Sequence, residues 1–275
     1  MRKILTFLFS TIVLLTYGQA DRAVKTPVKV YDTAHTVVFY DLQYLRDSTK
    51  TTAYLEGLTM LRISDSYLSF ADYYAVYSDS LNDYAALSRK NDRAVDKVIG
   101  AIYKKERYKI PLLTNLQTQQ TTFQTGVWTK LEYTVATPQI RWTLVEGDTV
   151  VTNVACRKAV CRYAGRNYIA WYAESIQMPY GPYIFGGLPG LIMCIYDVKR
   201  NWIFTCNGIE SASSLRSMYL YTEKDRKKMD RKKALSIYRN ELENMISVGI
   251  AKGRLFNVPP ESVRKTSSNM LELEW

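Results

Sequence analysis

Residues 150–172 read VVTNVACRKAVCRYAGRNYIAWY, and this stretch decides the fold class. Apolar and β-branched residues are frequent from Val150 to Tyr163 and again from Tyr168 to Tyr172, which is typical of strands. Between them, Ala164-Gly165-Arg166-Asn167 predicts a tight turn with glycine at a position that tolerates positive φ. Two strands joined this closely must run antiparallel, because a parallel connection needs a crossover of a dozen or more residues.

The hairpin lies within a longer run of strands over residues 127–209. We predict the other strands of this run at 127–135, 140–145, 191–196 and 202–206. Upstream, residues 28–44 predict one or two strands and residues 60–70 predict a hairpin. The pattern favours an α+β fold that is mainly antiparallel β, with a curved open sheet or half-barrel.

Two helices complete the predicted fold. Val95, Val98, Ile99 and Ile102 mark the apolar face of a shorter helix over residues 94–105. Residues 222–250 predict one long C-terminal helix that packs on the sheet, with Thr222 and Asp225 as its capping box. Seven Lys or Arg residues between 224 and 233 oppose the helix dipole there, so this basic face is either solvated or a contact for an anionic partner.

The two ends of the chain differ from the middle. Residues 1–20 combine Arg2 and Lys3 with an apolar stretch and small residues before position 21, which is typical of a signal peptide. Residues 21–255 predict a single β-rich domain, and residues 256–275, with Pro259-Pro260, predict a flexible tail. We therefore expect an exported protein of the periplasm or the outer cell surface.

Composition excludes several classes of function. The 275 residues carry a formal charge of +11 and contain one histidine, His35, which makes histidine-dependent catalysis and zinc sites hard to assemble. The glycines near residue 190 lack the Lys-Ser/Thr of a phosphate loop. We predict no cofactor and no metal site. The positive charge suits acidic partners, but export argues against nucleic acid.

The four cysteines suggest disulfides in an exported protein. Cys194 and Cys206 flank a turn predicted at residues 198–201, so they could face each other on paired strands, and we prefer this pairing. Cys156 and Cys161 lie five residues apart in one strand and are either bridged or free.

Residues 181–192 read GPYIFGGLPGLI, and Gly187-Leu188-Pro189-Gly190-Leu191-Ile192 spells GLPGLI. Further characteristic residues are Trp142, residues 154–159, Gly165-Arg166-Asn167-Tyr168, Ala170-Trp171 and Gly181-Pro182. Together with the motif, they make the chain resemble the GLPGLI family of exported Bacteroidetes proteins over roughly residues 30–230. The resemblance implies export in a Gram-negative bacterium and a β-rich domain, and it supplies no catalytic residues. By fold analogy we further expect a sheet curled around a helix, similar to periplasmic lipoprotein carriers.

We expect a non-enzymatic envelope protein that binds or carries an apolar ligand: a lipid, a lipidated protein or a hydrophobic peptide. The candidate residues of the cavity or its rim are Trp142, Tyr168, Trp171, Tyr183, Phe185 and Leu188. The alternative is an accessory interaction protein for an outer-membrane transport system or another envelope protein, using the basic face or the tail. A carboxylate-dependent hydrolase is a weaker third reading, because nothing selects two of the many Asp and Glu residues.

Overall fold

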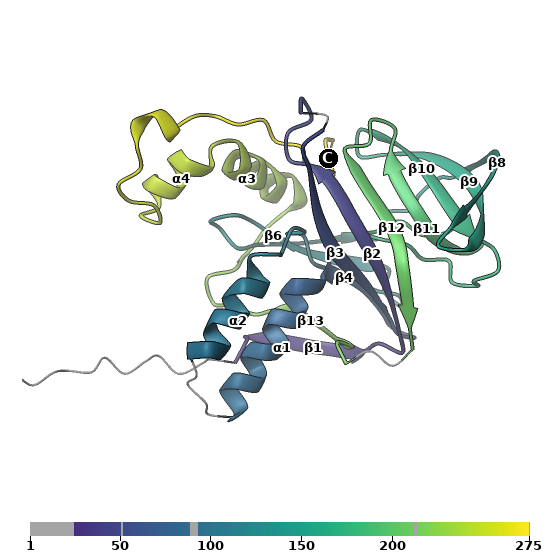
Figure 1. Cartoon of the computed structure of the whole chain (residues 1–275), viewed down its shortest axis with the longest axis horizontal. Helices are drawn as coiled ribbons and strands as arrows, with labels where there is room; N and C mark the ends of the chain where they lie inside the picture. The colour runs from purple at the N-terminus through teal and green to yellow at the C-terminus, as the bar shows by residue number, and fades with distance from the viewer. Residues whose placement is uncertain (1–24, 51, 89–92, 212–213, 275) are drawn as a thin grey trace, which may run out of the picture.

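One large open sheet of 12 strands dominates the molecule (Figure 1). The computed structural model describes residues 25–274 except 51, 89–92 and 212–213, so the predicted signal peptide lies outside the described residues. The expectation of a mainly antiparallel, open sheet is confirmed, because all neighbouring strands pair antiparallel except β14 and β7.

Along the described residues, all of the strands precede the last two α-helices. In chain order, the strands and helices are β1 (Val28–Thr33), β2 (Thr36–Leu45), β3 (Tyr54–Ile63), β4 (Tyr67–Asp72), α1 (Tyr73–Ser88), α2 (Arg93–Tyr103), β5 (Leu112–Asn115), β6 (Gln120–Thr125), β7 (Leu131–Ala136), β8 (Thr143–Val151), β9 (Val154–Tyr163), β10 (Arg166–Ala173), β11 (Leu191–Asp197), β12 (Trp202–Glu210), β13 (Ser217–Tyr221), β14 (Lys227–Lys228), α3 (Arg231–Glu243), α4 (Met245–Ala251) and η1 (Pro260–Ser262).

The large sheet consists of two meanders that meet in its middle. The first runs from β2 outward to β7, and the second runs from β8 at the far edge back to β12, which pairs with β2. β8 carries a bulge between Val145 and Asp148. The turns that flank β9 have positive φ at both central residues, Thr152-Asn153 and Ala164-Gly165, as two-residue hairpins of type I′ require.

Alternating side chains of the central strands enter two separate cores. Val38, Tyr40 and Leu42 of β2 join the larger core, whereas Val37 and Phe39 contact the smaller one on the other face. The smaller core is covered by the two-stranded sheet β1–β13 and by α1. α1 and α2 lie near one end of the central strands, and α3 and α4 lie near the other (Figure 1).

The single helix predicted over residues 222–250 is wrong. Lys227 and Lys228 form β14 at the sheet edge, and the backbone N–H groups of Lys227 and Met229 donate to carbonyls beside and within β7. α3 begins only at Arg231, where the side chain of Asp230 accepts from the N–H of Lys233. A second break at Asn244, with φ −118° and ψ 37°, separates α3 from α4. Most of the basic stretch is therefore kept out of a helix whose dipole would oppose it.

The preferred disulfide between Cys194 and Cys206 is also wrong, since all four cysteines are free thiols. Cys194 of β11 pairs with Thr205 of β12, and its Sγ lies 3.7 Å from the Thr205 Oγ1 on the same face. Cys206 is the next residue along β12, so its side chain points to the opposite face of the sheet. An offset of one residue in the register is enough to separate the two sulfur atoms.

The chain after α4 crosses to the end of the sheet where β2 meets β12, and the C-terminus lies there (Figure 1). Residues 256–275 were predicted as a flexible tail, but residues 269–272 are buried, because Met270 and Leu271 contribute to the larger core. Within the described residues, no helix has both the length and the apolar character needed to cross a membrane.

Candidate functional site

The C-terminal strap, residues 265–274, is the segment around which the candidate site is built. It forms neither helix nor strand, yet Leu271 is 1% exposed and Met270 and Glu272 are 4% exposed. A buried segment without regular structure must satisfy its backbone polar groups elsewhere. In this protein, side chains of the sheet and α3 do so.

Arg166 at the start of β10 makes the closest contacts with the strap backbone. Its Nη2 donates to the carbonyl of Met270 at 2.5 Å, and its Nε donates to the carbonyl of Leu271 at 3.1 Å. The hydroxyl of Tyr168 donates to the same Leu271 carbonyl at 3.3 Å. Because every peptide carries these carbonyls, such contacts hold a segment without selecting its sequence.

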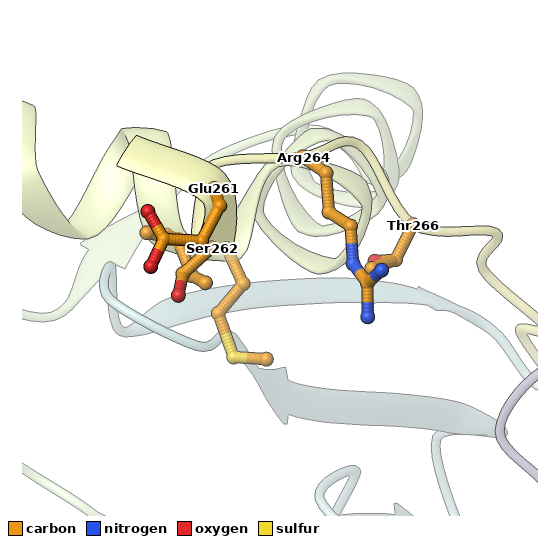
Figure 2. A pocket seen from close by; sticks show the side chains of 6 residues that line it. Glu261, Ser262, Arg264 and Thr266 are labelled. Atoms are coloured by element: carbon orange, nitrogen blue, oxygen red, sulfur yellow. The ribbon is translucent and has the colours of Figure 1, made fainter. Parts of the chain in front are cut away.

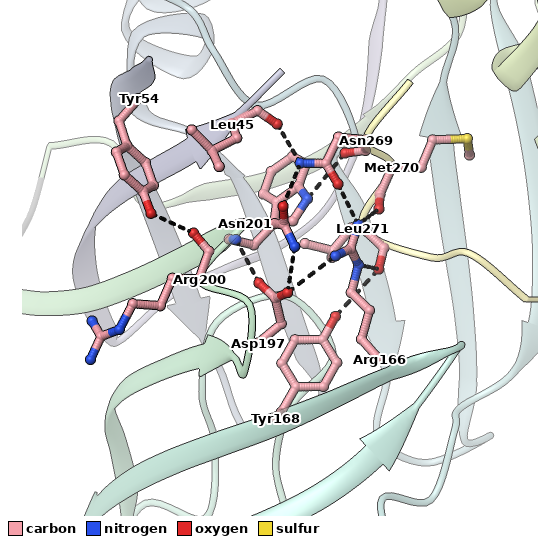
Figure 3. Close-up of polar contacts among 11 residues, drawn as sticks. Leu45, Tyr54, Arg166, Tyr168, Asp197, Arg200, Asn201, Asn269, Met270 and Leu271 are labelled. Carbon is pink, nitrogen blue, oxygen red and sulfur yellow. Dashed lines mark hydrogen bonds and ion pairs between the residues drawn. The ribbon is translucent and has the colours of Figure 1, made fainter. Parts of the chain in front are cut away.

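Asn269 anchors the start of the buried segment. The indole Nε1 of Trp202 donates to its carbonyl at 3.1 Å, and Arg166 Nη2 donates to its side-chain oxygen at 2.6 Å. Its side-chain nitrogen donates to the carbonyl of Leu45 at 2.5 Å. Figure 3 shows these contacts converging where β2, β10 and β12 come together.

Asp197 holds Arg166 in place for these contacts. The Asp197 carboxylate lies 3.2 Å from Arg166 Nη1, and both side chains are almost fully buried. It also accepts from the Asn201 side chain and from the Trp202 N–H, each at 2.8 Å (Figure 3). A buried guanidinium needs such a charged, hydrogen-bonded partner to offset its desolvation.

The far end of the strap docks on the β9–β10 turn. The N–H groups of Leu273 and Glu274 both donate to the carbonyl of Ala164, at 2.9 and 3.3 Å. Arg239 of α3 donates to the Leu273 carbonyl at 3.0 Å. The side chain of Glu274 is exposed and pairs with Arg162 at the surface.

The carboxylate of Glu272 occupies a polar pocket in the otherwise aromatic interior. Its Oε1 accepts from the hydroxyls of Tyr163 at 2.9 Å and Tyr183 at 2.5 Å. Its Oε2 pairs with Arg231 Nη2 at 2.7 Å. Burial, followed by the negative charge of Glu272, raises the pKa of Tyr163 and Tyr183 well above the usual range. Both phenols therefore stay protonated and can act as donors.

Tyr183 reaches Glu272 from an unfavourable backbone conformation. Its φ is +59°, which is rare for a bulky residue and costs roughly 1–3 kcal/mol. The turn that imposes this conformation is closed by the Phe185 N–H, which donates to the Pro182 carbonyl at 3.1 Å. The conformation directs the phenol to the strap while Phe185 enters the core.

The residues predicted to line a ligand cavity are mostly packed against each other. Tyr168, Tyr183, Phe185 and Leu188 are buried, and the ring centroid of Phe185 lies 4.7 Å from Tyr168, 6.0 Å from Tyr183 and 6.3 Å from Trp142. Trp171 is not part of this group. It lies on the other face of β10, where its Nε1 is 3.4 Å from the Tyr196 hydroxyl. Tyr168 and Tyr183 are the two of the six that hydrogen-bond the strap.

The motif Gly187-Leu188-Pro189-Gly190-Leu191-Ile192 has a structural place beside this group. Leu188, Leu191 and Ile192 are buried in the larger core, and Tyr40 donates to the Ile192 carbonyl at 2.9 Å. A Cβ on Gly190 would lie 2.1 Å from the carbonyl oxygen of Ala173, so only glycine fits there.

Two surface hollows lie away from the predicted cavity residues. One of about 410 Å³ opens between α4 and residues 261–266, beside Glu261, Ser262, Arg264 and Thr266 (Figure 2). The other, of about 440 Å³, lies between α3, α4 and Thr129. Neither is lined by the aromatic residues singled out in the sequence. Over the described part of the chain, no group of three His, Cys, Asp or Glu residues is placed to hold a metal ion.

Sequence reasoning missed the residues that hold the strap most firmly: Tyr163, Arg166, Asp197, Trp202, Arg231, Asn269 and Glu272. The one local signal was the apolar pair Met270-Leu271 within an otherwise polar tail. Arg231 was assigned to a basic face that is either solvated or a contact for an anionic partner, whereas in the structure its side chain pairs with the buried Glu272.

No family model and no curated protein matches the chain. Structural matches include two crystal forms of a protein named PNGF-II, with TM-scores of 0.45 and 0.47 and 9% sequence identity. Each alignment covers 74% of this chain but 33% and 32% of the PNGF-II chains, so this chain spans about a third of their length. At these values the similarity carries no functional argument.

Proposed function

We propose that the protein is an exported, non-enzymatic binding protein that takes a hydrophobic peptide segment at the position of the C-terminal strap. The observation that carries this proposal is the mode of docking. Side chains of Arg166, Tyr168, Trp202 and Arg239 donate to four strap carbonyls. The strap side chains of Met270 and Leu271 add apolar contacts with the larger core. A peptide bound in trans could make the same contacts.

The strap would then be a resident ligand that a partner must displace. A tethered segment competes at an effective concentration of about 1 mM. A peptide in solution therefore binds weakly to the intact chain and more tightly once the strap is weakened. The motif and the apolar N-terminus support membership in the GLPGLI family and export, which belong to the same proposal.

The test uses the full chain and a labelled peptide with the sequence of residues 267–274, followed by fluorescence anisotropy. In Leu271→Ala the resident strap loses a buried side chain, so we expect the peptide to bind about 30-fold or more tightly than to wild type. Leu273→Ala is the matched control, because Leu273 is 39% exposed, and it should bind like wild type. Absence of peptide binding to Leu271→Ala would reject the proposal.

The same samples test the alternative hypothesis that the protein carries a lipid. Native mass spectrometry with lipid extraction should show no stoichiometric lipid on the purified protein. A co-purifying lipid would favour a lipid carrier over a peptide binder.

The second candidate is an accessory interaction protein of the cell envelope. The observation that favours it is that Lys227 and Lys232 are exposed near the β14 edge of the sheet. Lys227→Glu with Lys232→Glu should then abolish partner capture. Arg231 is left intact in this test, since reversing its charge would disturb Glu272 instead.

A further inference from the structure

The pocket around Glu272 belongs to the body of the protein and not to the strap. Tyr163 comes from β9, Tyr183 from the loop before β11, and Arg231 from the first turn of α3. Burial and the negative charge of Glu272 raise the pKa of the Tyr133 phenol of β7, and the charge of Arg231 lowers it, so this phenol lies beside the same ion pair. Three separate elements thus direct one cation and two phenols at a single carboxylate.

Displacing the strap removes that carboxylate. Arg231, whose side chain is 28% exposed, would then lack its carboxylate partner, and the phenols of Tyr163 and Tyr183 would lose their acceptor. Leaving buried donors and a partly buried charge unpaired is costly. A purely apolar ligand would leave this cost in place, whereas a ligand that carries a carboxylate would remove it.

Resting on the proposed peptide-binding function, we propose that Tyr163, Tyr183 and Arg231 form a carboxylate subsite. The site takes a peptide segment in which an acidic side chain follows two apolar residues, as Glu272 follows Met270 and Leu271. When such a peptide displaces the strap, its carboxylate replaces the carboxylate of Glu272. The backbone contacts hold any peptide, and the subsite selects among them.

The test compares three peptides on the full-length Leu271→Ala chain by fluorescence anisotropy. The first has the natural sequence of residues 267–274, the second has glutamine in place of Glu272, and the third has glutamine in place of Glu274. We expect the second to bind about tenfold or more weakly than the first, because a charge-assisted hydrogen bond is lost. The third should bind like the first, since Glu274 is exposed and outside the subsite.

Arg231→Met in the same background should reduce the difference between the first two peptides to about twofold or less. Tyr183→Phe keeps the aromatic ring and should reduce the difference in affinity between the first two peptides in part. This variant replaces Arg231→Met in the test if Arg231→Met fails to fold. Equal binding of all three peptides to Leu271→Ala would overturn the carboxylate subsite and leave peptide binding intact. Failure of every peptide to bind would instead reject the proposed function itself.

Discussion

Arg231, the first residue of α3, and Glu272 in the C-terminal strap form an ion pair of 2.7 Å across 41 residues of sequence. The other end of α3 also holds the strap, since Glu243 pairs with Lys265 at 3.1 Å and its carbonyl accepts from the Thr266 N–H at 2.8 Å. The strap is thus fixed at both ends of one helix. Any movement of α3 away from β7 must also loosen the strap.

Glu272→Gln should destabilise the protein by about 3 kcal/mol, because it leaves Arg231 without its anion in a largely buried site. Glu274→Gln is the matched control, since its pair with Arg162 is exposed, and it should change stability by less than about 0.5 kcal/mol. Urea unfolding followed by tryptophan fluorescence measures both. Equal losses of stability in the two variants would show that the ion pair between Arg231 and Glu272 contributes no more to stability than an exposed pair.

The antiparallel meander could be predicted from sequence because its signals are local. Ala164 and Gly165 form the turn where glycine and strand periodicity placed it, although Arg166 and Asn167 belong to β10. Register is harder to predict, since a shift of one residue moved Cys206 to the opposite face from Cys194. The strap was missed because its burial depends on Arg166 and Arg231, which lie between 41 and 105 residues away and carry no sign of an inward orientation.

The prediction of a single helix over residues 222–250 was wrong for a different reason. The apolar residues from Ala234 to Tyr238 do form the buried face of α3. The residues before α3, however, donate their backbone N–H groups to carbonyls at the sheet edge instead of forming helical hydrogen bonds. Periodicity does not detect a competing strand partner such as β7. Competition of this kind between local propensity and tertiary pairing overrides a helical pattern that has no support from packing.

All four thiols should be unreactive in the folded protein. Burial raises the pKa of Cys161 to about 12 and that of Cys206 to about 11, and it also raises the pKa of Cys156 and Cys194. At pH 8 we expect iodoacetamide to modify none of them within minutes in the native state, and all four after unfolding in guanidinium without reductant. Mass spectrometry counts the adducts. Modification of only two thiols until a reductant is added would reveal a disulfide and contradict the structure.

Asp79 should make stability depend on pH. Burial raises the pKa of its carboxyl above the usual range, against hydrogen bonds from the hydroxyls of Tyr219 and Tyr221. A carboxyl whose pKa is raised by folding stabilises the native state fully below its unfolded pKa of about 3.9, and this contribution is lost as pH rises through the folded value.

Asp79→Asn removes that titration while keeping an oxygen to accept from the tyrosines. The free energy of unfolding of Asp79→Asn, relative to wild type, should therefore increase between pH 4 and pH 7 in urea titrations. Asp65→Asn is the control, because the Asp65 side chain is fully exposed and pairs with His35 at the surface. A difference between Asp79→Asn and wild type that is the same at both pH values would contradict the assignment.

The start of α3 gives the last test. The side chain of Asp230 accepts from the N–H of Lys233 at 2.9 Å, so Asp230→Ala should destabilise the protein by about 1 kcal/mol through loss of the N-cap. Asp225→Ala is the matched control: if Thr222 and Asp225 capped a longer helix, its effect would be as large. In the structure Asp225 forms an exposed pair with Lys130, which predicts a change below about 0.5 kcal/mol in chemical unfolding. Because Arg231 directly follows Asp230, the cap also sets the position from which the guanidinium reaches Glu272, so Asp230→Ala should weaken strap protection in hydrogen exchange while Asp225→Ala leaves it unchanged.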